Sequence, residues 1–159
     1  MSFNGSYKQG LAWNACHDPT ADELFFGGGA RSGKSIFICA HEIIEAVAWP
    51  GTRGLIGRKE YTTLRDSTMQ TWWEVMTMFG YRAGIDYKWN GADQECRWSN
   101  GSLTMFRHLK PEPADPNYTR LGQRHSRGRH WTKGMNVKTG SLKCYCSGPG
   151  STHHRTGER

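Results

Sequence analysis

The pattern of apolar and polar residues in the first third of the chain predicts a strand, a helix and a second strand. The apolar run 24–26 ends at three glycines, as a buried strand does when it enters a tight turn. Residues 35–49 are apolar nearly all round and are followed by Pro50-Gly51, which predicts a core helix. The run 54–57 completes a βαβ unit and indicates an α/β fold with a parallel sheet flanked by helices. The expected polar face of the helix consists of His41, Glu42 and Glu45.

Further along the chain, apolar residues recur with a spacing near 3.6 over residues 61–79, and Gly80 follows, which predicts a second helix. Two alternating runs, 96–98 and 103–105, lie on either side of Asn100-Gly101. That dipeptide favours a type I′ turn, so we expect an antiparallel β-hairpin. The tryptophans at helix and hairpin positions are interpreted as core packing rather than base stacking; these are Trp72 and Trp98.

The charge is unevenly distributed along the 159 residues. Residues 1–122 carry 13 basic and 13 acidic side chains, whereas residues 123–159 carry eight basic ones and a single acid, Glu158. We therefore predict one domain over 1–122 and a disordered basic tail over 123–159. No apolar run reaches the roughly 18 residues of a membrane span, and the five cysteines are scattered. These features predict a soluble intracellular protein with free thiols and no membrane association.

One motif in the chain carries recognisable chemistry. Residues 28–35 fit the pattern G-x-x-x-x-G-K-[ST] between a predicted strand and a predicted helix, which is the setting that a phosphate-binding loop requires. Backbone N–H groups would surround the phosphates of ATP, Lys34 would reach the β/γ oxygens, and Ser35 would bind Mg²⁺. The alternative is a glycine-rich turn with no ligand. The motif consists of Gly28, Gly29, Ala30, Arg31, Ser32, Gly33, Lys34 and Ser35.

The stretch 25–35, together with 57–67 downstream, resembles the large subunit of tailed-bacteriophage DNA-packaging terminases, and the likeness covers about residues 5–122. The resemblance implies a P-loop NTPase fold and an ATPase motor that packages double-stranded DNA into procapsids in the host cytoplasm. It also implies a C-terminal nuclease, and a portal protein and a small terminase subunit as partners. By the same resemblance Gln9 would contact adenine, and Arg31 would sense the γ-phosphate and act with Lys34 in catalysis. The plainer alternatives are a surface glutamine and a solvated loop arginine.

A Walker B strand, which ends in Asp and Glu, is missing from the sequence. No acidic residue lies between Asp115 and Glu158, so we expect ATP binding without efficient hydrolysis. Reading the codons for 130–136 in a shifted frame forces Leu, Asp and a later Glu, and it permits Glu directly after the Asp. We interpret residues 123–159 as an out-of-frame tail on a truncated terminase; a divergent native tail is the alternative.

Two other functions are compatible with the sequence. A small nucleic-acid-binding protein would use the basic tail, and a helicase-type P-loop ATPase would need a DNA-contact motif that we do not find after the second strand. Cys144-x-Cys146 and His153-His154 have the residue types of a zinc site but not its usual spacing, so we do not predict a metal there.

Overall fold

A computed structural model of the chain describes residues 5–18, 23–26, 32–109, 131–138 and 141–145. The helical elements are α1 Tyr7–Cys16, α2 Lys34–Ala48, α3 Tyr61–Thr63, the π-helical segment η1 Leu64–Thr68, and α4 Met69–Met78. The strands are β1 Glu23–Phe25, β2 Arg53–Arg58, β3 Tyr87–Asn90, β4 Glu95–Trp98, β5 Leu103–His108, β6 Trp131–Lys138 and β7 Ser141–Tyr145.

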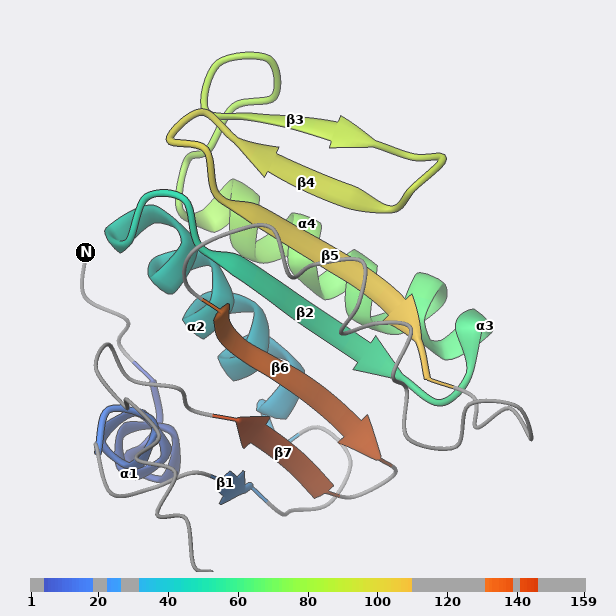
Figure 1. Cartoon of the computed structure of the whole chain (residues 1–159). Coiled ribbons are helices and arrows are strands. Elements are labelled where there is room, and N and C mark those ends of the chain that lie inside the picture. Colours follow the sequence, from blue (N-terminus) through green and yellow to red (C-terminus); the bar gives the residue numbers. More distant parts are fainter. Residues whose placement is uncertain (1–4, 19–22, 27–31, 110–130, 139–140, 146–159) are drawn as a thin grey trace, which may run out of the picture.

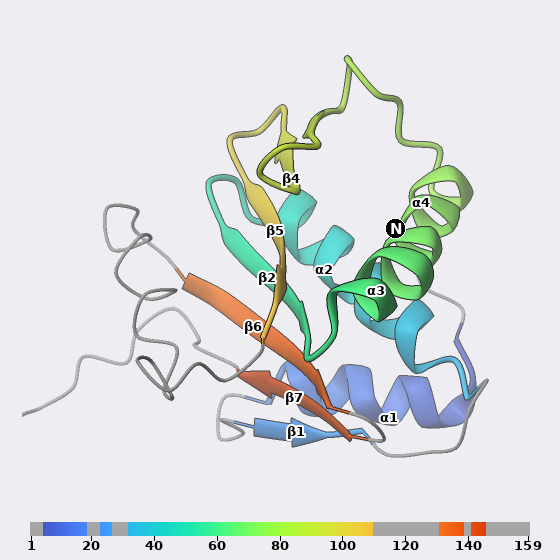
Figure 2. The ribbon, with the colours of Figure 1, turned by 90° about the vertical axis from the view of Figure 1, so that its right-hand side faces the viewer.

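The strands form one sheet in the order β1-β7-β6-β2-β5-β4-β3. Strand β2 runs parallel to both β5 and β6, whereas β4 is antiparallel to β3 and β5. Helices α2 and α4 lie on the same face of the part formed by β2, β5, β4 and β3 (Figures 1 and 2). The predicted α/β class with flanking helices is therefore confirmed, but the sheet is mixed rather than parallel.

The predicted βαβ unit is present as β1, α2 and β2. Strand β1 is antiparallel to β7, β7 is antiparallel to β6, and β6 is parallel to β2. It follows that β1 and β2 run in the same direction, with two strands between them. Helix α2 is the crossover, as the hydrophobic pattern predicted.

Helix α2 differs from the prediction in its surroundings. The sequence predicts a polar face that includes His41 and Glu42, but these side chains are only 1% and 4% exposed. The prediction is wrong here because α2 packs against the sheet, α4 and α1, so that most of its circumference is covered. The more exposed apolar positions of the helix are instead Ile36 and Val47.

The second predicted helix exists as three consecutive pieces, α3, η1 and α4, and it ends where expected, with Gly80 at φ 74°. Trp72 is fully buried, and its ring meets Phe106 edge-to-face with centroids 5.1 Å apart. Trp98 is 5% exposed and lies 6.2 Å from Trp72 in a similar arrangement. Core packing is thus confirmed for both tryptophans.

The β4–β5 hairpin is confirmed, but its turn is not type I′. Asn100 does not have the positive φ that this turn requires of it, since Gln94 is the only non-glycine with positive φ among the described residues. Trp98 and Ser102 close a three-residue loop with Gly101 at φ 87°. The Asn100 amide instead donates to the Ala46 carbonyl at 2.8 Å, which ties the hairpin to the end of α2.

Strands β6 and β7 lie within residues 123–159, which the sequence predicts to be a disordered basic tail, so the prediction is wrong for these two segments. Both are held by backbone pairing, β6 with β2 and β7 with β1. Backbone ladders need no particular side chains, which is why composition did not reveal them. Residues 110–130, 139–140 and 146–159 lie outside the described residues.

Helix α1 and strand β3 were not predicted from the sequence. The signal for α1 was the spacing of Ser6 and Gln9, since the Ser6 amide donates to Gln9 Oε1 at 2.7 Å, as in a capping box.

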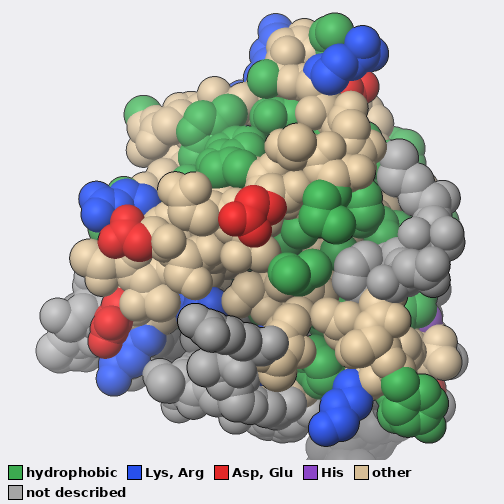
Figure 3. All heavy atoms as spheres, turned by 180° about the vertical axis from the view of Figure 1, so that it is seen from behind, with side chains coloured by type: hydrophobic (Ala, Val, Ile, Leu, Met, Phe, Trp, Pro, Cys, Tyr) green, Lys and Arg blue, Asp and Glu red, His purple; other side chains and the backbone are tan. Residues whose placement is uncertain are grey.

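No helix within the described ranges is long and apolar enough to cross a membrane. Seen from behind, the molecule carries apolar side chains in several patches among polar ones (Figure 3). Cys16, Cys39 and Cys96 are buried, and none of the three forms a disulfide bond within the described part of the chain.

Candidate functional site

The second half of the predicted phosphate-binding loop leads directly into α2. Gly33 has φ 75° and immediately precedes Lys34 and Ser35, which open the helix. Residues 28–31, including Arg31, lie outside the described residues. A left-handed backbone followed by a helix N-terminus points the free N–H groups of the first turn toward one spot, and this is the local geometry of anion sites at helix ends.

Gln9 lies against this loop rather than on the surface. Its Nε2 donates to the Gly33 carbonyl at 3.0 Å, its Oε1 accepts from the Ser6 amide, and the residue is 7% exposed. A Cβ on Gly33 would lie 2.6 Å from Gln9 Nε2, so any other residue there would meet both backbone strain and a clash. The surface-glutamine alternative is therefore wrong, and Gln9 ties α1 to the loop.

Lys34 and Ser35 each have a polar side-chain neighbour. Lys34 Nζ donates to Ser32 Oγ at 2.9 Å, so the ammonium group folds back over the loop. Ser35 Oγ accepts from Arg58 Nη2 at 3.2 Å. Two motifs that are 23 residues apart in the sequence thus meet at the start of α2.

Arg58 belongs to the downstream motif at 57–67, and its residue type and position in the sequence did not predict a role for it. Its Nε also donates to Thr68 Oγ1 at 2.6 Å, so the guanidinium bridges the end of α2 that carries Ser35 and the π-helical segment. Burial lowers the pKa of Arg58, and the neighbouring Cys39 thiol opposes this effect. π-Helical turns often occur at functional sites. This one places the Thr68 hydroxyl within hydrogen-bonding distance of the Arg58 guanidinium.

The electrostatics of this region favour an anion. The positive end of the α2 dipole, the Lys34 ammonium and the Arg58 guanidinium lie close to the same helix start. A phosphate chain supplies the negative charge that such a group of donors can bind. Ser35 Oγ has two lone pairs, so it can accept from Arg58 and still ligate a cation such as Mg²⁺.

A second polar cluster lies at the other end of α1, and the sequence did not predict that its residues meet. His17, His41 and Glu45 come together there, and the signal was the spacing of four residues between the last two on a helix.

Comparisons of the chain with family models, with curated proteins and with solved structures found no match. The described residues define an α/β protein with a mixed sheet and a glycine turn that leads into a buried helix.

Proposed function

We propose that this chain is the ATP-binding part of a terminase large subunit, the motor that packages double-stranded DNA into viral procapsids. The observation that carries the proposal is the left-handed Gly33 directly before Lys34 and Ser35 at the start of a buried crossover helix. The motif of residues 28–35 and its downstream partner at 57–67 support the terminase type. Double-stranded DNA, a portal protein and a small terminase subunit are the partners that this proposal includes.

In this proposal Lys34 contacts the β/γ oxygens and Ser35 binds Mg²⁺, which supplies charge neutralisation at the phosphates. Arg31 is assigned the γ-phosphate-sensing role, and Gln9 the adenine-contacting role, that the resemblance implies. The contact between Gln9 and Gly33 supports a role near the nucleotide loop. Arg58 adds a second cation that holds the Ser35 side chain in place.

Hydrolysis is expected to be slow. Hydrolysis requires a carboxylate side chain that activates the attacking water as a general base. The sequence offers no acidic residue between Asp115 and Glu158, where the Walker B strand would lie. Glu42 cannot substitute, because its carboxyl is buried against Gly54 and Thr104 on the sheet side of α2. The chain therefore binds Mg·ATP and releases it largely unreacted.

The direct test is binding of a fluorescent ATP analogue to the full chain with and without Mg²⁺. Lys34→Ala should weaken binding at least tenfold, whereas Lys88→Ala, an exposed lysine on β3, should leave the affinity unchanged. Equal affinity in wild type and Lys34→Ala would overturn the proposed site. Turnover of about 1 s⁻¹ or faster, abolished by Lys34→Ala, would overturn the slow-hydrolysis part alone.

The terminase assignment is tested in the gene. Resequencing the codons for 121–134 should show a single-base insertion, or an equivalent two-base deletion, whose repair restores a Leu-Asp-Glu strand and a longer frame. A stop codon soon after the repair, or Lys or Gln after the Asp, would show that residues 123–159 are native and would contradict this part of the proposal.

A further inference from the structure

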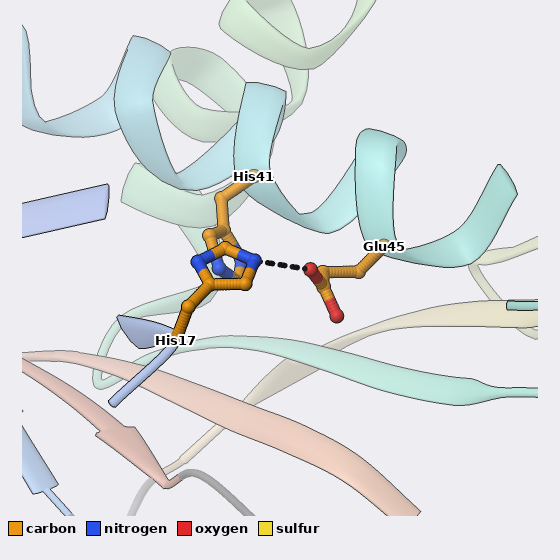
Figure 4. A group of neighbouring side chains, drawn as sticks. All are labelled: His17, His41 and Glu45. Carbon is orange, nitrogen blue, oxygen red and sulfur yellow. Dashed lines mark hydrogen bonds and ion pairs between the residues drawn. The ribbon is translucent and has the colours of Figure 1, made fainter. Parts of the chain in front are cut away.

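Three side chains with metal-binding groups meet between the end of α1 and the middle of α2 (Figure 4). His41 and Glu45 are one turn apart on α2 and share a face, while His17 approaches from the residue after α1. One nitrogen or oxygen from each lies within 4.8 Å of the others. His17 Nε2 is 3.0 Å from Glu45 Oε1.

The contacts of His17 identify the nitrogen that is free to bind a cation. Its Nδ1 lies 2.8 Å from the Trp13 carbonyl, which can only accept, so Nδ1 carries the hydrogen. In the neutral ring, Nε2 then presents a lone pair toward the Glu45 carboxylate, which is also only an acceptor. A cation, either a proton or a metal ion, is needed between them. A backbone carbonyl behind the other ring nitrogen is the usual arrangement for a metal-binding histidine.

His41 provides an independent observation. The residue is 1% exposed, and neither of its ring nitrogens has a hydrogen-bond partner in the described part of the chain. The ring is packed among aromatic neighbours, Trp13 at 5.2 Å and Phe37 at 5.9 Å between centroids. Leaving a buried polar group without a partner is unfavourable, and a metal bond would satisfy one of its nitrogens.

We propose that His17, His41 and Glu45 bind a divalent transition metal, with Zn²⁺ as the best match. Two imidazoles and one carboxylate form a recognised zinc ligand set, with a fourth position open to water. Neighbouring ligand atoms in a tetrahedral site are about 3.4 Å apart, close to the His17–Glu45 spacing. The His17 side chain is 43% exposed, so the fourth position has access to solvent. Mg²⁺ prefers an all-oxygen set, which separates this site from the one at Ser35.

The metal would join α1 to α2 at one end of α1, and Gln9 near the other end holds Gly33. Metal binding would therefore restrain the helix that positions the predicted phosphate loop. This consequence, unlike the site itself, rests on the proposed nucleotide function. It predicts tighter binding of the ATP analogue in the zinc-loaded chain.

The test uses the full chain, stripped with a chelator and titrated with ZnCl₂ in a calorimeter in the absence of nucleotide. One equivalent should bind with a dissociation constant of about 1 µM or tighter. Co²⁺ should give the intense visible bands of a tetrahedral site. Glu45→Gln and His17→Ala should each weaken this binding at least tenfold, and circular dichroism should show that both variants remain folded.

Two controls separate this site from others. The double variant His153→Ala/His154→Ala should keep the zinc equivalent, and Lys34→Ala should keep it even if nucleotide binding is lost. The proposal is overturned if wild type binds no zinc, if Glu45→Gln and His17→Ala bind it as wild type does, or if the tail variant abolishes it. A zinc site with no nucleotide binding would instead count against the proposed function only.

Discussion

Gly54 on β2 lies against the carboxyl group of Glu42 on α2, so closely that a Cβ on Gly54 would overlap both carboxyl oxygens. The same carboxyl accepts a hydrogen bond from Thr104 Oγ1 on β5 at 3.0 Å. The residue is 4% exposed. A single buried carboxyl therefore occupies the contact between the helix and two parallel strands, and the absence of a side chain at Gly54 creates the space for it.

Gly54→Ala should lower the free energy of unfolding by about 1–3 kcal/mol or more, because the added methyl displaces the Glu42 carboxyl in a packed core. Gly10→Ala is the matched control: an added Cβ there meets nothing within 4 Å, and the position is inside α1. That substitution should stabilise the chain by about 0.5–1 kcal/mol through helix propensity. Urea denaturation of both variants measures the contrast, and an equal response at the two glycines would contradict the contact.

Burial raises the pKa of Glu42 from 4.5 to about 8, with the Thr104 hydroxyl opposing the shift and Glu45 adding to it. The unfolded chain loses this proton near pH 4.5 and the folded chain holds it to about pH 8. Stability from this group is thus complete below pH 4.5 and falls as the pH rises through this window, by at most ~1.4 kcal/mol per unit.

Glu42→Gln cannot titrate, so the difference in unfolding free energy between wild type and variant should shift in favour of the variant between pH 5 and pH 8. Urea denaturation at several pH values, with a chelator present, measures this difference. A relative gain by wild type over the same range would show that the carboxyl is ionised in the folded chain.

The two buried tryptophans provide a matched pair. Trp98 Nε1 donates to Thr104 Oγ1 at 3.1 Å, whereas Trp72 Nε1 has no partner among the residues that the structure describes. Replacement by Phe removes the same ring atoms at each position, so the hydrogen bond should make Trp98→Phe costlier by about 0.5–1.5 kcal/mol. Thermal or urea unfolding of the two variants compares them directly. A larger loss for Trp72→Phe would indicate that ring packing, not the hydrogen bond, controls both sites.

Local pattern determined the order and type of several elements. The apolar run before the glycines, the periodicity of residues 35–49 and 61–79, and the alternation around Asn100-Gly101 predicted β1, α2, α4 and the β4–β5 hairpin. These features depend on backbone propensities and on periodicities of two or 3.6 residues, which neighbouring positions in the chain specify by themselves. The positions of Lys34 and Ser35 at the start of a helix follow from the same local signals.

The tertiary structure decided which polar residues are buried and which distant ones meet. His41 and Glu42 occupy helix positions that periodicity assigns to solvent, yet α1 and the sheet cover them, because burial depends on which elements pack on each face. The contacts of Gln9 with Gly33, Arg58 with Ser35, and His17 with Glu45 join segments 23 to 28 residues apart. Such contacts arise only when the chain has closed its loops and packed its helices, and no local pattern encodes them.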